Sequence, residues 1–128
     1  MRLIGVSMSN KIYDMKFKKV FQLLIDKAEK KGKTRQDVII LTNWLTGYSS
    51  IQIEQFFNSD ISYGDFFNGA CNFNDNCKNI TGKICNVDIS SIEDEIMRRI
   101  RYLDKLIDLL ARGKNVDQII KKYENPSK

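Results

Sequence analysis

The sequence contains no histidine, one proline and three cysteines in 128 residues. Without histidine, Ser-His-Asp and Cys-His nucleophilic pairs and a histidine general base are excluded. A zinc site of the usual mixed Cys/His type is excluded for the same reason. The residues indicate no catalytic group, no metal ion and no cofactor, so they favour a protein that is not an enzyme.

The three cysteines, Cys71, Cys77 and Cys85, are an odd number at loose spacing, which is a poor disulfide framework. We therefore expect reduced thiols. No apolar run approaches the roughly 18 residues that span a bilayer. The start, "MRLIGVSMSN", lacks the pattern of a secretory signal. These observations predict a cytoplasmic protein without a membrane partner.

The one proline, Pro126, lies in the tail, and no Gly/Ser-rich linker or internal repeat divides the chain. A chain of this length can bury one sizeable core. We expect an N-terminal extension over residues 1–9 that is poorly ordered, one helical domain over 10–123, and a tail over 124–128.

Apolar residues at three- and four-residue spacing predict a first helix over 15–31 that ends at Gly32. Thr34 and Asp37 have the spacing of a capping box, which predicts the start of a second helix. Gly47 stands where a glycine in a left-handed turn would end that helix. The stretch "TGYSS" is therefore interpreted as the joint between two helices.

Two further capping-box patterns predict later helix starts. Ser49 and Gln52 begin a short third helix, and Ser90 and Glu93 begin a long helix over about 92–112. The long helix carries an apolar seam at Ile96, Ile100, Leu103, Ile107 and Leu110. A helical wheel at 100° per residue places basic side chains on its opposite side, namely Arg98, Arg101, Lys105 and Arg112.

The predicted fold is mainly α, a compact single-domain helical bundle of four to six helices. Phe66 and Phe67 are expected to anchor a short helical turn before an Asn- and Asp-rich loop. The alternation in "ITGKICNVDI" allows one short strand near 80–89. A last short helix is predicted at "KNVDQIIKKY", with apolar residues facing inward.

Several of these stretches together resemble a bacterial family catalogued as domain of unknown function 2200. They are "KIYDMKF" (11–17), "KAEKKGKT" (27–34), "WLTGY" (44–48), "ITG" (80–82) and "IRYLDKLIDLLARGK" (100–114). The resemblance covers about residues 10–120 and implies a bacterial, cytosolic, single-domain protein with no established activity or site. The family start is similar to "MSNKIY", so the resemblance makes Met8 an alternative translation start.

The sequence departs from the family pattern in two places. The pattern has a glycine where Asn86 stands and an Asp-Pro step at Asp94 and Glu95. Both differences lie just before the predicted long helix, so they bear on the turn that leads into it.

Charge is segregated along the chain although the net charge is only +5. Residues 11–35 and 96–128 are each strongly basic, with nine Lys or Arg apiece, whereas residues 36–95 hold nine acids and two lysines. Such a layout suits charge complementarity within the fold or with a partner.

The leading functional hypothesis is a non-enzymatic protein-interaction module, whose partner is either another protein or, in self-association, a second copy of the same chain. Its motivation is the broad apolar face of the long helix around Tyr102, Leu106 and Leu109, together with the segregated charge. The plainer interpretation is that neighbouring helices cover this face.

Two alternatives remain open at this point. The first is nucleic-acid binding by a basic surface, which would displace counterions from phosphates. Its residues would be Lys16, Lys18, Lys19, Lys27, Lys30, Lys31, Arg98, Arg101 and Lys105. The second is a small-molecule pocket in the aromatic, acidic middle of the chain. Its residues would be Trp44, Tyr48, Phe56, Asp65, Phe66 and Phe67.

Overall fold

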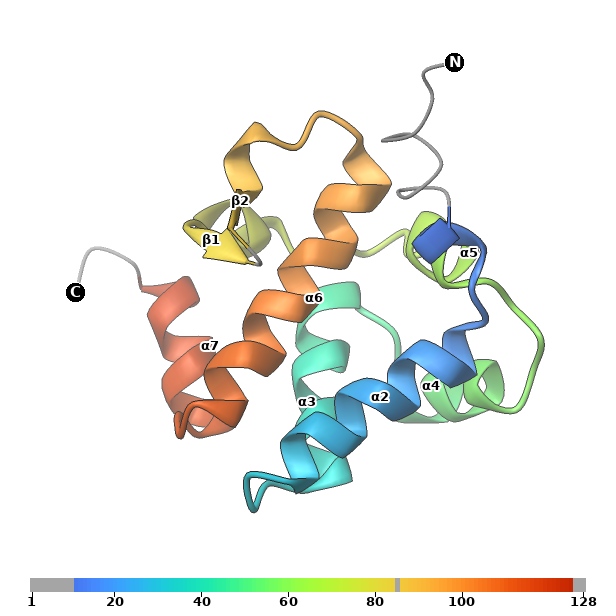
Figure 1. The fold of residues 1–128 in the computed structure, drawn as a ribbon, viewed down its shortest axis with the longest axis horizontal. Coiled ribbons are helices and arrows are strands. Elements are labelled where there is room, and N and C mark those ends of the chain that lie inside the picture. The colour runs from blue at the N-terminus through green and yellow to red at the C-terminus, as the bar shows by residue number, and fades with distance from the viewer. Residues whose placement is uncertain (1–10, 85, 126–128) are drawn as a thin grey trace.

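Helix α6 (Glu95–Ala111) runs through the middle of the molecule, and the other helices are arranged around it (Figure 1). The computed structural model describes residues 11–84 and 86–125. The expected N-terminal extension, the alternative start at Met8, and Cys85 therefore lie outside the described residues. The other α-helices with full bounds are α2 (Phe17–Glu29), α3 (Arg35–Thr46), α4 (Ser50–Phe57), α5 (Tyr63–Asn68) and α7 (Val116–Glu124).

The mainly helical, single-domain prediction is confirmed. The predicted short strand is a two-stranded antiparallel hairpin, β1 (Lys83–Ile84) and β2 (Val87–Asp88), in which Lys83 pairs with Asp88. Two 3-10 helices lie beside it in the chain, η1 (Asp75–Asn79) and η2 (Ile89–Ser91). The Asn- and Asp-rich loop therefore contains a helical turn.

The first long helix begins two residues later than its periodicity predicts, because Lys16, directly before it, is extended. Lys16 forms an isolated antiparallel bridge with Ser62. The backbone N–H of Phe17 donates to the Ile61 carbonyl at 2.9 Å, and the N–H of Tyr63 donates to the Met15 carbonyl at 2.7 Å. These bonds hold residues 15–17 beside residues 61–63, so α2 starts at Phe17 and not at residue 15.

The caps predicted for α3 and α4 are confirmed. Thr34 accepts from the backbone N–H of Asp37, and Ser49 accepts from that of Gln52, each with the reciprocal bond of a capping box. Gly47 ends α3 with φ at 81°, in the left-handed region. These elements depend on neighbours within four residues, which is why the sequence alone predicts them.

The predicted start of α6 is wrong. Ser90 belongs to η2, and Asp94 is the N-cap of α6, with its side chain accepting from the backbone N–H of Met97. Glu95 is therefore the first helical residue, and the helix starts about three residues later than predicted. An aspartate is as good an N-cap as a serine. Asp94 caps the helix because Ile92, between Ser90 and Asp94, is extended and separates η2 from α6.

The core between α2, α4 and α5 is built from stacked aromatic rings. Phe17 stacks on Phe66 with ring centroids 4.1 Å apart, and Phe66 also meets Phe67 edge-on at 5.1 Å. Tyr48 and Phe56 pack on the same ring at 4.9 and 5.4 Å. Aromatic pairs in such geometry add roughly 0.5–1.5 kcal/mol each beyond the area they bury. Phe66 thus joins the N-terminal helix to the middle of the chain.

Among the helices of residues 11–84 and 86–125, none is both long enough and apolar enough to cross a membrane.

Gly47 and Gly32 make a matched pair for testing the joint after α3. Both have φ near 80°, but a Cβ on Gly32 would meet nothing within 4 Å, whereas one on Gly47 would collide with the Asn72 carbonyl oxygen and lie 2.8 Å from its Cβ. We expect Gly32→Ala to cost roughly 1–2 kcal/mol in unfolding free energy. Gly47→Ala should cost about 1–3 kcal/mol more, because the Asn72 backbone must move. Urea unfolding measures both losses; an equal loss would contradict the close approach.

Candidate functional site

The outer face of α2 carries most of the lysines that the sequence singles out. The inner face buries Phe17, Phe21, Ile25 and Ala28 among others, so the side chains three and four residues apart on the opposite face are exposed. They include Lys19, Leu23 and Lys27, together with Gln22, Asp26 and Glu29, and Lys30 and Lys31 follow the helix end. Leu23 is 57% exposed, one of the large apolar side chains that the described residues leave at the surface.

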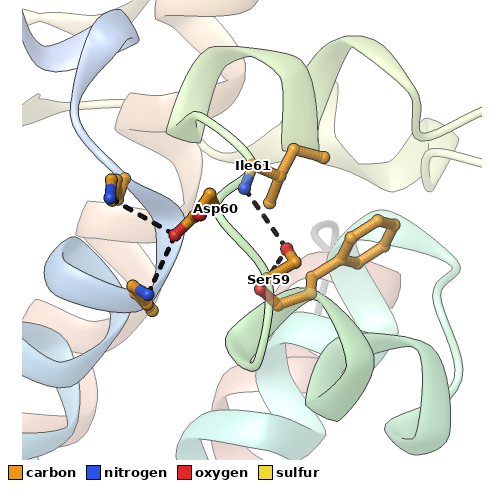
Figure 2. A network of polar contacts seen from close by, with 6 residues as sticks. Ser59, Asp60 and Ile61 are labelled. Atoms are coloured by element: carbon orange, nitrogen blue, oxygen red, sulfur yellow. Dashed lines mark hydrogen bonds and ion pairs between the residues drawn. The ribbon is translucent and has the colours of Figure 1, made fainter.

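Two of the predicted lysines share one aspartate (Figure 2). Lys16 Nζ and Lys18 Nζ lie 3.3 and 3.0 Å from Asp60 Oδ1, in the loop between α4 and α5. Hydrogen bonds from Lys18 and Lys16 lower the pKa of Asp60. The loop itself is fixed by Ser59, whose hydroxyl accepts from the Ile61 N–H at 3.2 Å. These two lysines therefore pair with a carboxylate of the same chain.

Two shallow hollows flank Leu23. One, of about 610 Å³, lies between α2 and the end of α4 and is lined by Lys18, Lys19, Gln22, Leu23, Phe57 and Asn58. The other, of about 640 Å³, is toward the C-terminal end of α2 and is lined by Leu23, Asp26, Lys27, Glu29, Lys30 and Lys31. Lys27 also lies 3.4 Å from Asp108 of α6. Leu23 is the residue common to both hollows.

Three of the basic residues predicted along α6, Arg98, Arg101 and Lys105, are half-buried, whereas Arg112 is exposed. The Arg98 guanidinium donates to the Ile92 carbonyl at 2.7 Å, and the Lys105 ammonium donates to the Lys83 carbonyl at 3.2 Å. Arg101 pairs with Asp104 at 2.9 Å. Arg98 and Lys105 thus contact segments before the helix, whereas the partner of Arg101 lies in α6 itself.

The six residues of the predicted aromatic pocket lie in three separate surroundings. Phe66 and Phe67 are fully buried, and Tyr48 and Phe56 pack against Phe66 at the edge of the same core. Asp65 is exposed and accepts a hydrogen bond from the Tyr13 hydroxyl at 3.2 Å.

Trp44 is the sixth predicted pocket residue, and it lies apart from the other five. Its indole N–H donates to Glu124 at 2.8 Å, and its ring centroid is 6.5 Å from that of Tyr123. Trp44 therefore belongs to the contact between α3 and α7.

A polar cleft that the sequence did not predict lies between residues 71–77 and the first turns of α6. Its volume is about 280 Å³, and its walls are formed by Cys71, Phe73, Asn74, Asp75, Cys77, Glu95, Arg98, Arg99 and Tyr102. The sequence alone predicts a loop for the run "CNFNDNC" and places Arg98 in an exposed basic surface. Arginine, acidic and cysteine residues meet here only because the two segments pack together.

Both cysteines of the described chain that line this cleft are free thiols, Cys71 exposed and Cys77 half-buried. Burial raises the pKa of the Cys77 thiol, although a hydrogen bond to Tyr102 and the nearby arginines lower it in part. A thiol with a raised pKa is a weak nucleophile near neutral pH, so Cys77 has no sign of activation.

We expect iodoacetamide to alkylate Cys71 faster than Cys77 at pH 8. The thiolate of Cys77 forms only at higher pH, so its alkylation rate should reach half of its maximum above the ordinary cysteine value of about 8.5. Mass spectrometry of the two peptides over a pH series measures both rates. Equal rates at pH 8 would show that the Cys77 side of the cleft is open.

In the stretches 11–84 and 86–125, no group of three or more acidic or cysteine side chains is placed to hold a metal ion. No curated protein matches the chain. The chain is similar to a protein of known crystal structure described as uncharacterized protein SP1917, with 45% sequence identity and a TM-score of 0.88 over 90% of this chain and 94% of that one. The family described as uncharacterized protein conserved in bacteria (DUF2200) matches residues 11–121. The chain therefore belongs to this bacterial family, the domain of unknown function 2200.

Proposed function

We propose that the protein is a protein-interaction module that binds its partner through the outer face of α2. The observation that carries this proposal is the exposure of Leu23 between two hollows. An interface anchor is typically a large side chain at the centre of a contact, with polar residues around it. Leu23 has this arrangement, because lysines and Gln22 surround it on the same helix.

The hollow between α2 and α4 offers an apolar floor with a polar rim. Leu23 and Phe57 supply the apolar surface, and Lys18, Lys19 and Asn58 stand around it. Phe57 is held in place by the Arg35 guanidinium, which lies over its ring 5.2 Å from the centroid and is itself paired with Glu54 at 2.8 Å. A rigid aromatic floor costs little conformational entropy when a partner binds.

Charge on this face favours a protein over a nucleic acid. Asp26 and Glu29 line the same hollow as Lys27, Lys30 and Lys31. A polyanion would meet these carboxylates as repulsive groups at close range, and its binding depends on displacing counterions from an uninterrupted row of phosphates. A protein surface can present both signs of charge, together with an apolar residue to cover Leu23.

The test is capture of a partner from a lysate of the source bacterium by the tagged protein and two variants. Leu23→Asp places a charge at the proposed anchor. Ile51→Asp is the matched control, because Ile51 is 73% exposed on α4 and lines neither hollow. We expect a specific protein to be retained by the wild type and by Ile51→Asp, but about thirtyfold less tightly by Leu23→Asp, as for loss of an interface hot spot.

Quantitative mass spectrometry of the retained proteins gives the comparison, with and without nuclease treatment of the lysate. Equal retention by Leu23→Asp would remove the α2 face from the proposal. If the retained proteins are lost after nuclease treatment, nucleic-acid binding would replace the protein-interaction proposal. Circular dichroism of both variants checks that each keeps its helices.

A further inference from the structure

The polar cleft beside α6 has features that the proposed function does not use. One wall is the face of α6 that carries Glu95, Arg98, Arg99 and Tyr102, which extends about 10 Å along the helix axis. The other wall is the chain from residue 71 to residue 77, including the start of η1. The outer face of α2 shares no lining residue with it.

The guanidinium of Arg99 is held in a fixed position in this cleft. Its Nη1 donates to the carbonyl oxygens of Phe67 at 2.7 Å and Ala70 at 3.4 Å. Its plane lies over the Phe73 ring, 4.3 Å from the centroid, and its side chain is 19% exposed. These contacts occupy Nη1 and one face of the group, and Nη2 forms an ion pair with Glu95 at 3.6 Å, a distance too long for a hydrogen bond.

Arg98 is held in a similar way by the Ile92 carbonyl. Two neighbouring guanidinium groups are thus positioned before any ligand arrives, which reduces the entropy lost on binding. Guanidinium groups with remaining N–H donors recognise carboxylates through charge-assisted hydrogen bonds. The cleft therefore contains a place for a carboxylate.

The same cleft also contains two carboxylates of the protein. Glu95 lies at the first position of α6, and Asp75 comes from the opposite wall. Asp75 makes no ion pair within residues 11–84 and 86–125. With two guanidinium groups and two carboxylates, the lining has no net charge, so a multiply charged anion such as a polyphosphate would be repelled by Asp75 and Glu95.

We propose that this cleft binds a small zwitterion of amino-acid size. The ligand carboxylate pairs with Arg98 and Arg99, and its ammonium group pairs with Asp75 and Glu95. The cleft volume of about 280 Å³ lies just below the roughly 300–1,000 Å³ of typical small-molecule sites, which agrees with a compact ligand. Phe73, already stacked on Arg99, contributes apolar surface beside the charged groups.

The experiment is a titration of the ¹⁵N-labelled protein with each of the common L-amino acids, followed by NMR. For at least one amino acid we expect saturable shifts concentrated in residues 71–77 and 95–102. The matched probes are its des-amino carboxylic acid and its methyl ester, which keep the carboxylate or the ammonium group alone. Each should bind at least about tenfold more weakly, because one charged partner is left without its counterpart.

Variants separate the cleft from the rest of the surface. Asp75→Asn and Glu95→Gln should each weaken binding by about tenfold, while Glu93→Gln, exposed and outside the lining, should leave it unchanged. Asp75 is exposed, so its variant is expected to fold normally. The absence of saturable shifts with every amino acid, each titrated to its solubility limit, would overturn the proposal. Equal binding of the des-amino acid, or equal weakening by Glu93→Gln, would also overturn it.

Discussion

The enclosure of α6 is the constraint on which the rest of the structure depends. Every residue from Ile96 to Ala111 is buried or half-buried, and α2, α3, α5, α7, β1 and η2 all contact this helix. Polar groups that lose water must find partners within the protein. The cationic side chains of α6 accordingly donate to backbone carbonyls of its neighbours, from Arg98 to Ile92, from Arg99 to Phe67 and from Lys105 to Lys83. They hold the surrounding segments against the helix.

The sequence predicted what depends on nearby residues and missed what depends on packing. The boxes at Thr34 and Ser49 and the turn at Gly47 are decided within four residues, and all three are confirmed. The capping pattern at Ser90 predicted the wrong start for α6, because the extended Ile92 that separates Ser90 from the true N-cap, Asp94, is not visible in that pattern. For α6 a helical wheel gives the direction of each side chain but not what lies opposite, so a partly covered side was interpreted as an exposed basic surface. The polar cleft beside α6 was missed for the same reason, because the sequence does not show that residues 71–77 pack against this helix.

Asn86 and Glu95, where the sequence departs from the pattern that the family resemblance implies, both have side chains that fit the backbone conformation at their positions. Asn86 has φ at 67°, a conformation that glycine adopts without cost and that asparagine tolerates better than most residues. Glu95 is the first helical residue after the N-cap, the position where proline is favoured because its missing N–H is not needed. A glutamate there interacts favourably with the helix dipole instead. Both residues therefore suit the backbone that leads into α6 in this structure.

The hydrogen bond between Trp44 and Glu124 links the second long helix to the final residue of α7. Because the sequence contains a single tryptophan, all indole emission from this protein arises at that contact. Trp44 is half-buried against Tyr123, and detachment of α7 would expose the indole to water and shift its emission to longer wavelength. The protein thus carries an intrinsic optical reporter for the docking of its last helix, and it requires no added label.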